Sequence, residues 1–550
     1  MKINDWENWY TFSTYLKAPY VDLEAAAKVF VESGFAECVF LRDGMTFWRT
    51  ENGFQKGETT IKLKPSTKEA TFQVTVQDNA ENEMTSFGAE TWAIGTKFRF
   101  SELRLFGEES SLPPPYLRAF LGYMQFIEKE KLIIGCYPIV TLYESGIFLI
   151  QFRIIGKSKE VEQFINDDVN IPRRQFDSVE VNPTISLLAP SAYYEQLYWP
   201  MSITIRLRLH KMFQIHRTTH HKLIRTEKIG DFNFQLTPLS GEKDQKETIT
   251  SVAQTLFSIV SYLNSIPRTG IKYILFGNNK PLQLGNYWSG RPHIHIIRHS
   301  NQADAASKNE ERNKKYFGWI ITRSYGMADN GNKFLPKSQR MFEDYSSYIA
   351  SSSMLWVWSK SGLAMQEKWD DKNRGHLIYE NEALGCLVEY GYMLNKSLSD
   401  SLSEVATVDI HDVLSTRRFI IDLKERMAHS SQYGEVNEFL NEGWDALGLN
   451  QTQLTITESI HVLETEAKLL ESKRTDRTGK AITILFGLLT VPTFTESVTK
   501  PFWKYFGFWR PQDPNLYKLF IIGITTILVL VLVISLIQLL YSKSRRFLNY

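Results

Sequence analysis

The sequence contains little cysteine, with three residues among 550, namely Cys38, Cys136 and Cys386. They are scattered along the chain, no two are separated by two residues, and an odd number cannot form a complete disulfide framework. This usage is typical of a reducing compartment, where disulfides are rare. Structural zinc sites need cysteine and histidine ligands at short spacings, so the pattern predicts no bound metal.

Signals for secretion and for catalysis are also missing. The first residues, MKINDWENWY, are acidic and polar where a signal peptide has its apolar core, so we expect the large N-terminal part to stay in the cytoplasm. The chain has no Walker loop, GxSxG, HExxH or dinucleotide glycine fingerprint. We therefore expect neither enzyme activity nor a cofactor. The formal net charge of +2 gives no indication of a nucleic-acid partner, and we expect no direct contact with nucleic acid.

One long apolar run stands near the C-terminus, LFIIGITTILVLVLVISLIQLLY, over residues 519–541. As a helix it would extend over about 34 Å, which exceeds the roughly 30 Å of a bilayer core. The run carries no charge, and core helices of soluble proteins are seldom apolar on every face over such a length. It predicts a membrane-spanning helix.

A shorter apolar run over residues 481–498 predicts an earlier span, although its length also suits an interfacial segment. Basic residues lie before this run and after the longer one, namely Lys473, Arg474, Arg477, Lys480, Lys543, Arg545 and Arg546. The positive-inside rule places both flanks in the cytoplasm. We therefore expect a multi-pass protein of the inner (cell) membrane with both termini cytoplasmic. The alternative is a single tail anchor preceded by an amphipathic helix.

The remaining sequence predicts a mixed α/β (α+β) domain followed by a helical region. Residues 1–340 alternate strand-like runs such as ATFQVTVQ and HIHIIRH with helical stretches, and two subdomains joined near residues 190–200 are expected. Residues 341–480 carry mostly helical periodicity and predict a stalk. Residues 481–550 form the predicted membrane domain with spans at about 481–498 and 519–541.

The last soluble helix has the apolar spacing of a coiled coil. Residues at alternating spacings of four and three predict one seam, namely Ile456, Ile460, Leu463, Ala467 and Leu470. From Gln451 to Val491 the pattern predicts one helix of about 40 residues, near 60 Å long, that enters the membrane. An ordinary helix of an intramolecular bundle is the alternative.

These features together resemble the CorA family of divalent-cation transporters. The resemblance rests on the long helix continuing into ESKRTDRTGKAITILFGLLTVPTF, the short outside loop, the second span and the basic tail, with Pro492 at a position where that family often has proline. It implies a cytoplasmic domain on a stalk helix, a homopentamer embedded in the lipid bilayer, and a pore lined by the first spans.

The outer mouth of the pore departs from that family. Its signature is a Gly-Met-Asn tripeptide preceded by an aromatic residue, and the nearest segment here is FGFW, comprising Phe506, Gly507, Phe508 and Trp509. A tryptophan offers no carbonyl oxygen to a hydrated hard cation. The resemblance therefore indicates the architecture better than the transported ion.

Five residues of the first run fall on one helical stripe and are candidate pore-lining residues, namely Thr483, Gly487, Thr490, Phe494 and Ser497. Small and hydroxyl groups with one aromatic constriction suit a gated pore of low selectivity. The alternative is that the small residues mark close helix packing in lipid.

The most basic segment, RLRLHKMFQIHRTTHHKLIRTEK, contains the candidate ligand-binding residues Arg206, Arg208, His210, Arg217 and Lys222. In a strand the first three share one face, where guanidinium groups can bind phosphate oxygens of a nucleotide or another anionic ligand. The alternatives are a solvated face paired with acids and a basic surface near anionic lipid. His293 and His295 share a face of another predicted strand, where structural roles are favoured over a metal site.

Three functions are consistent with these observations. The first is an oligomeric CorA-like channel or transporter for cations or small solutes, with a cytoplasmic regulatory domain. The second is a membrane effector gated by a nucleotide messenger, like the CorA-like proteins that accompany some CRISPR systems in antiphage defence. The third is a membrane-anchored binding or scaffold protein without a pore.

Overall fold

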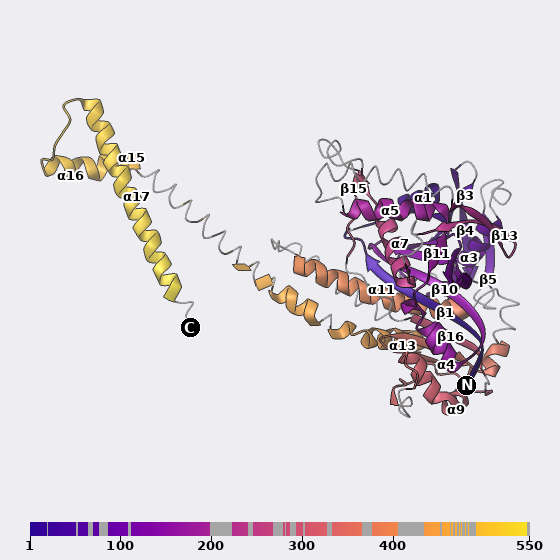
Figure 1. Ribbon diagram of the computed structural model, residues 1–550. Coiled ribbons are helices and arrows are strands. Elements are labelled where there is room, and N and C mark those ends of the chain that lie inside the picture. The colour runs from indigo at the N-terminus through magenta and orange to yellow at the C-terminus, as the bar shows by residue number, and fades with distance from the viewer. Residues whose placement is uncertain are drawn as a thin grey trace. The chain divides into compact units, whose positions relative to one another are not determined.

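The structure is a computed structural model of the 550-residue chain (Figure 1). It describes residues 1–18, 20–50, 53–63, 70–75, 86–107, 110, 112–197, 223–239, 246–267, 279–280, 282–285, 293–300, 303–326, 333–365, 377–404, 418, 434–451, 454–462, 464–465, 468–469, 472, 475, 479, 482 and 491–546. The chain divides into two compact units. The first comprises Met1–Glu404 and Phe419–Ile456, and the second comprises Val405–Arg418 and Thr457–Tyr550.

The first unit is built around a large mixed sheet, which has eleven strands in the described residues. Its order is β17-β18-β16-β1-β10-β9-β6-β2-β3-β4-β5. Neighbouring strands are antiparallel except β16 and β18, which are parallel. The strands are β1 (Lys2–Tyr15), β2 (Ala36–Leu41), β3 (Met45–Thr50), β4 (Gly53–Leu63), β5 (Ala70–Thr75), β6 (Tyr116–Leu121), β9 (Pro138–Tyr143), β10 (Ile147–Glu160), β16 (His293–Ser300), β17 (Tyr345–Ile349) and β18 (Ser353–Trp358).

A smaller antiparallel sheet has the order β12-β13-β11-β7-β8. Its strands are β7 (Met124–Glu128), β8 (Lys131–Cys136), β11 (Ser178–Val181), β12 (Arg225–Ile229) and β13 (Phe232–Pro238). A short pair, β14 (Ile266–Pro267) and β15 (Asn279–Lys280), completes the described strands. Because Met124 and Val179 of this sheet are buried in the same core as the large sheet, the two sheets belong to one packed body.

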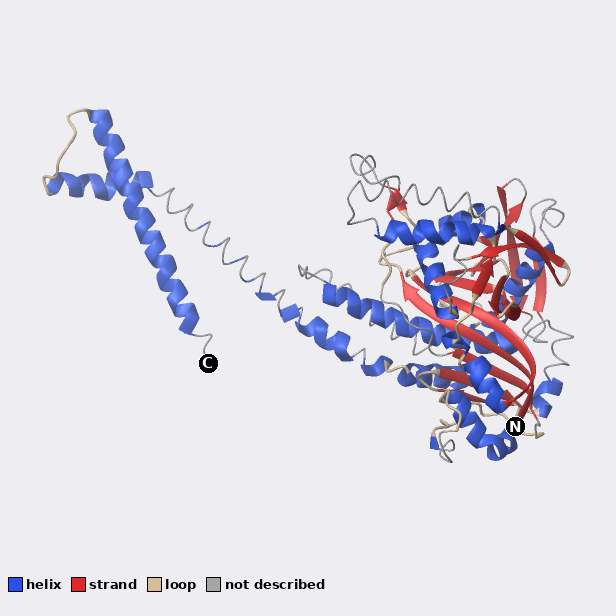
Figure 2. Cartoon of the chain, in the orientation of Figure 1, coloured by secondary structure: helices blue, strands red, loops and turns tan. Residues whose placement is uncertain are grey.

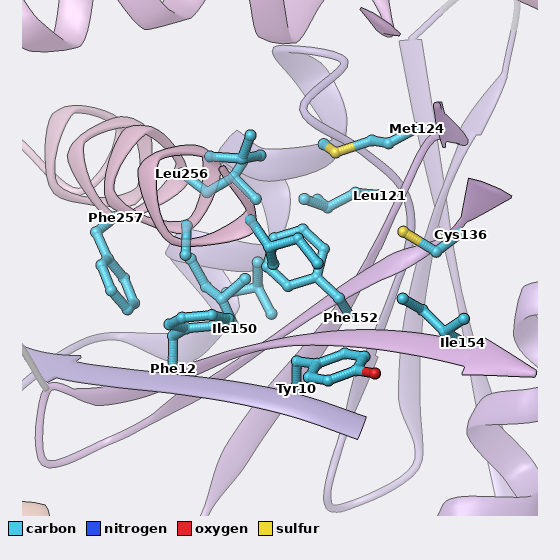
Figure 3. Close-up of a cluster of buried hydrophobic side chains, with 14 of the residues drawn as sticks. Tyr10, Phe12, Leu121, Met124, Cys136, Ile150, Phe152, Ile154, Leu256 and Phe257 are labelled. Atoms are coloured by element: carbon cyan, nitrogen blue, oxygen red, sulfur yellow. The ribbon is translucent and has the colours of Figure 1, made fainter. Parts of the chain in front are cut away.

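The alternation of side chains along β1 explains the two cores of this unit. Tyr10 and Phe12 point to one face of the large sheet and belong to the first core, whereas Trp9 and Tyr15 point to the opposite face and the second core. Figure 3 shows Tyr10 and Phe12 beside residues of β10 and of helix α7 in the first core. Both faces of the sheet are therefore covered.

Helices cover the two faces in separate groups (Figures 1 and 2). The first core receives side chains from α1 (Leu23–Glu32), α5 (Pro183–Leu197), α7 (Ile249–Leu263) and α9 (Ala306–Ile321). The second receives them from α3 (Ser86–Phe106), α11 (Leu377–Glu404) and α13 (Gly434–Ala446). The short helices α4 (Val161–Gln163), η1 (Phe164–Val169) and η2 (Ile171–Arg173) follow β10.

Local sequence explains where two of these helices begin. The Asp22 side chain accepts a hydrogen bond from the Ala25 N–H and caps α1. Thr248 caps α7 in a reciprocal arrangement with Ser251, in which each side chain accepts from the other residue's N–H. Both helices then present apolar residues to the first core.

Helices α11 and α13 pack unusually closely because each carries a glycine at the contact. A Cβ atom added to Gly391 of α11 would lie 2.5 Å from Nε1 of Trp444 in α13. One added to Gly443 of α13 would lie 2.7 Å from Cγ2 of Val388 in α11. Side chains at these positions would push the two helices apart.

The prediction of a mixed α/β fold is confirmed, but the helical region expected from residue 341 was wrong in its first part. β17 and β18 lie there and form one end of the large sheet. All six residues of β18, SMLWVW, are buried, so it lacks the alternation of a half-exposed strand. The boundary expected at 340 falls inside the first unit, and residues 190–197 of the expected join lie in α5.

The second unit contains a helical segment and a C-terminal hairpin. Each described residue between Thr457 and Ile482 is helical. The hairpin comprises α15 (Val491–Phe494), the π-helical turn η5 (Thr495–Thr499), α16 (Lys500–Tyr505) and α17 (Pro514–Arg546). Residues 483–490, the centre of the first predicted span, lie outside the described residues.

Candidate functional site in the C-terminal hairpin

Helix α17 contains the second predicted span and is longer than it at both ends. Asp513 begins the helix, because its Oδ1 accepts a hydrogen bond from the Asn515 N–H at 2.9 Å and Pro514 occupies the first helical position. The 33 residues from Pro514 to Arg546 extend over about 50 Å. The sequence expectation, 519–541, counted only the apolar residues.

The apolar side chains of Pro514–Val531, the part of α17 whose side chains the structure describes, are largely uncovered. Among the described residues, Pro514–Val531 is the one segment long and apolar enough to cross a membrane, and only 11% of it is buried. Leu519, Ile527 and Val531 are 71%, 64% and 56% exposed. A core helix of a soluble protein would bury such residues, whereas a continuous exposed apolar surface marks an interface with another protein or with a membrane.

One narrow face of α17 is buried, and it packs against the preceding helix of the hairpin. Ile521 and Thr525 are 2% and 0% exposed. The facing residues come from α15 and η5, where Val491, Thr495 and Thr499 are 6%, 4% and 5% exposed. Small β-branched residues on both sides let the two helix backbones approach closely.

Three threonine hydroxyls in the hairpin form hydrogen bonds inside their own helices. Thr525 Oγ1 donates to the carbonyl of Ile521 at 2.7 Å, and Thr526 Oγ1 donates to that of Ile522 at 2.8 Å. Thr495 Oγ1 donates to the carbonyl of Val491 at 2.6 Å. Because each hydroxyl bonds to a carbonyl four residues earlier, these polar atoms need no water.

The helix of the first predicted span continues beyond its expected end at residue 498. The π-helical turn η5 follows Phe494, and the Lys500 N–H donates to the carbonyl of Thr495, five residues earlier. The next residue, Pro501, has no N–H and cannot continue this ladder. Glu496 is exposed and pairs with Lys500 at 3.0 Å, so its charge is neutralised on the helix surface.

The predicted outer-mouth residues form the turn of the hairpin. The Phe506 N–H donates to the carbonyl of Phe502 at 3.1 Å, and Gly507 then adopts a φ of +67°, which ends α16. Phe506 and Phe508 stack with centroids 5.9 Å apart on either side of this glycine. Gly507 is therefore explained by the turn, a role that needs no bound ion.

Aromatic residues attach this turn to α17. Trp503 Nε1 donates to the carbonyl of Trp509 at 3.1 Å. The rings of Trp503 and Trp509 lie 5.7 Å and 5.6 Å from the ring of Phe520, both edge to face. Trp509 nevertheless stays 68% exposed. The cluster resembles the aromatic belts found at membrane interfaces.

The structure places two of the five predicted pore-lining residues. Phe494 is 42% exposed and Ser497 is also exposed, in the segment whose buried residues, Thr495 and Thr499, face α17. Phe494 and Ser497 are therefore not used in the contact within the hairpin. Thr483, Gly487 and Thr490 lie outside the described residues.

The predicted ligand-binding residues Arg206, Arg208, His210, Arg217 and Lys222 also lie outside the described residues. His293 and His295 lie on β16 as expected and are almost completely buried. His295 Nδ1 lies 2.9 Å from Oδ1 of Asn8, and burial lowers the pKa of His295 to about 3, so its ring is neutral. Within the described part of the chain, no group of three histidine, cysteine or acidic side chains could hold a metal ion.

The first two seam residues of the predicted stalk are buried within the single chain. Ile456 is 1% exposed and Ile460 is 5% exposed. The packing of this seam between copies stays a prediction. Leu463, Ala467 and Leu470 lie outside the described residues.

Sequence reasoning missed a buried polar cluster beneath α11. Arg118 of β6 donates to Glu382 of α11 at 3.0 Å and to Glu102 of α3 at 3.3 Å, and all three side chains are at most 2% exposed. Glu389, which follows Glu382 by seven residues in α11, accepts a hydrogen bond from the Ser13 hydroxyl of β1 at 2.5 Å. Glu382, Cys386 and Glu389 recur on one face of an otherwise apolar helix. This spacing is the feature of the sequence that could have indicated the buried cluster.

Comparisons with protein-family models, with curated proteins and with solved structures give no match to this chain. The resemblance to the CorA family therefore rests on the sequence pattern alone, and the site is interpreted from its own geometry.

Proposed function

We propose that the chain is an oligomeric, CorA-like membrane channel or transporter with a large cytoplasmic regulatory domain. The observation that carries this proposal is the hairpin of α15, η5, α16 and α17. The outer surface of Pro514–Val531 is apolar and uncovered, the hydroxyls of Thr495, Thr525 and Thr526 bond within their helices, and the turn is rich in aromatic residues. A lipid bilayer satisfies each of these properties at once.

In this arrangement residues 481–498 and 519–541 are the two spans and both termini are cytoplasmic. The exposed pair Phe494 and Ser497 lies on a surface that the hairpin does not use. In a ring of several copies this surface faces its counterparts around an axis, and the ring of Phe494 narrows and dewets the passage. Cations or small solutes then cross when this point widens.

Association of several copies also follows from the composition of the hairpin. A helix in lipid gains nothing from burying apolar surface alone, so helices associate through close packing and small polar groups. The face of each α17 that contains Ile521 and Thr525 already packs against the preceding helix of the same hairpin. The first helix, which keeps a serine and a phenylalanine exposed, is the element that would contact other copies.

Ion leak from liposomes tests this function. The purified chain is reconstituted as wild type and as Phe494→Ala, with Phe502→Ala as the matched control, because Phe502 is also an exposed aromatic residue but lies on α16. We expect Phe494→Ala to raise the basal leak, since removing the ring widens and wets the narrow point. Phe502→Ala should leak like the wild type.

The other functions give different outcomes in the same assay. A ligand-gated effector would leak only after a nucleotide extract is added, and the Phe494→Ala variant would no longer need it. A membrane-anchored scaffold would leak under no condition, and Phe494→Ala would then stay as tight as wild type. The last result would overturn the proposal.

A further inference from the structure

A cleft of about 380 Å³ lies where the two sheets of the first unit meet. The large sheet contributes Glu37 of β2 and Arg49 of β3, and the small sheet contributes residues of β13. Asn182 and Thr184, at the beginning of α5, close one side. Ligand pockets usually measure about 300–1,000 Å³, so this volume suits a small molecule and not a polymer.

Among the described residues, Arg49 is the one cation in the lining of this cleft, which also contains the acidic residues Glu37 and Asp231, and a glycine makes room for the Arg49 side chain. Gly34 has a φ of +72°, and a Cβ atom there would lie 2.9 Å from Nη1 of Arg49 and 3.2 Å from Oγ1 of Thr184. The carboxylate of Glu37 lies 3.9 Å from Nη1, which is too long for a hydrogen bond. The Arg49 side chain is 45% exposed, so solvent and small molecules can reach it.

Aromatic rings form part of the opposite lining. Phe87 of α3 lies 5.8 Å from Phe232 and 5.1 Å from Phe234, both of β13, with edge-to-face geometry. Tyr123 lies 5.6 Å from Phe234. The cleft therefore combines, within a mostly polar lining, aromatic rings against which a flat ring can pack and one guanidinium that can bind an anion.

Side-chain amides, together with Thr184 and Asp231, supply the other polar groups of the lining. Asn182, Asn233 and Gln235 line the cleft, and each amide can both donate and accept. The Oδ1 atom of Asn182 accepts from the Thr184 N–H at 2.8 Å, which orients this side chain. Burial raises the pKa of Glu37, and the nearby Arg49 acts in the opposite direction.

We propose that this cleft binds a small molecule composed of a planar ring and one carboxylate or phosphate group. The anionic group lies on Arg49, and the ring lies against Phe87, Phe232 and Phe234. The amides of Asn233 and Gln235 contact polar atoms of the ring. This inference concerns the first unit alone and does not depend on the membrane role of the hairpin.

Calorimetric titration of the detergent-solubilised full chain tests the proposal with two pairs of probes. Adenosine 5′-monophosphate is compared with adenosine, and indole-3-acetate is compared with indole. We expect at least one anion to bind about tenfold to a hundredfold more tightly than its neutral counterpart, as a charge-assisted contact predicts. The pair that shows the difference identifies a phosphate or a carboxylate as the preferred group.

Substitutions locate the binding. Arg49→Gln should remove the preference for the anion, and Arg49→Lys should restore it only in part, because lysine keeps the charge but lacks the planar fork. Lys56→Gln on the neighbouring β4 is the matched control, since it removes a half-exposed cation paired with Glu24 outside the cleft. Unchanged thermal midpoints establish that the variants are folded. Failure of both anions to bind, or equal binding by wild type and Arg49→Gln, would overturn the proposal.

Discussion

Arg118 and Glu382 form an ion pair at 3.0 Å, although they are 264 residues apart and both side chains are almost completely buried. The pair connects the centre of the large sheet to α11. The ring centroid of Phe98 in α3 lies 4.1 Å from Cζ of Arg118, so the ring covers the guanidinium group. Two charges held away from water stabilise the fold only together, because either one alone would be a buried, uncompensated charge.

Arg118→Met should therefore destabilise the first unit by about 3–5 kcal/mol, the usual cost of breaking a buried pair. Arg174→Met is the control, since Arg174 pairs with Glu128 at a partly exposed position and should cost about 0–1 kcal/mol. Thermal unfolding followed by circular dichroism measures both. Equal shifts in the two variants would show that burial adds nothing to the Arg118 pair.

The buried carboxyl group of Glu389 should make the free energy of unfolding depend on pH. Burial raises the pKa of its carboxyl well above the usual value, and its hydrogen-bond partner is the Ser13 hydroxyl. Between the unfolded and folded pKa values the folded chain binds the extra proton, so this group's contribution to stability falls as pH rises. The loss is about 1.4 kcal/mol for each pH unit in that window.

Glu389→Gln should remove this dependence, because glutamine has the same shape and carries no charge. Melting midpoints measured from pH 4 to pH 8 should coincide for the two proteins at the acidic end, with the variant more stable at the alkaline end. Parallel curves over the whole range would mean that Glu389 does not stay protonated in the folded chain.

The topology of the hairpin can be measured with cysteine labelling in intact cells. The native thiols do not interfere, because Cys38, Cys136 and Cys386 are buried and burial raises the pKa of Cys38 and Cys136 to about 12. We expect Lys504→Cys to react with an impermeant thiol reagent and Ser542→Cys to react only after the cells are opened. The reverse pattern would exclude two spans with cytoplasmic ends.

Neighbouring threonines on α17 provide a matched test of hairpin packing. Thr525 is fully buried against the first helix, whereas Thr526 lies on the more exposed side. Thr525→Leu should destabilise the hairpin by about 1–3 kcal/mol through overpacking, and Thr526→Leu should be nearly neutral. The thermal midpoint of each variant in detergent checks this. A neutral Thr525→Leu would mean that the two helices are not tightly packed.

The sequence predicted elements whose pattern is local. The apolar run of α17 and the HIHIIRH segment of β16 both led to the correct type of element, because a long uncharged run indicates a helix and a short run rich in isoleucine indicates a strand. The ends of α17 were missed because Asp513 and the charged final turn lie outside the apolar run. β17 was missed because YSSYI is short and has serines at its centre, and β18 was missed because all six residues of SMLWVW are buried and carry no alternation.

The cluster around Arg118 and the cleft around Arg49 could not be predicted in this way. Arg118 lies in the apolar segment YLRAFL, and its partners come from helices on both sides of it in the sequence. The cleft requires β3, β13 and α5 to meet, which depends on the order of strands in two sheets. Single-sequence patterns carry no information about such pairings.

The paired glycines between α11 and α13 determine how the chain can be divided for experiments. Trp444 packs against Gly391, and Val388 packs against Gly443. A fragment that stops at 340 or at Glu404 would lack these contacts and expose apolar surface. A fragment ending after Ile456 keeps both helices and the sheet they cover. Soluble expression of the N-terminal part should therefore succeed with the longer boundary and give aggregates with the shorter ones.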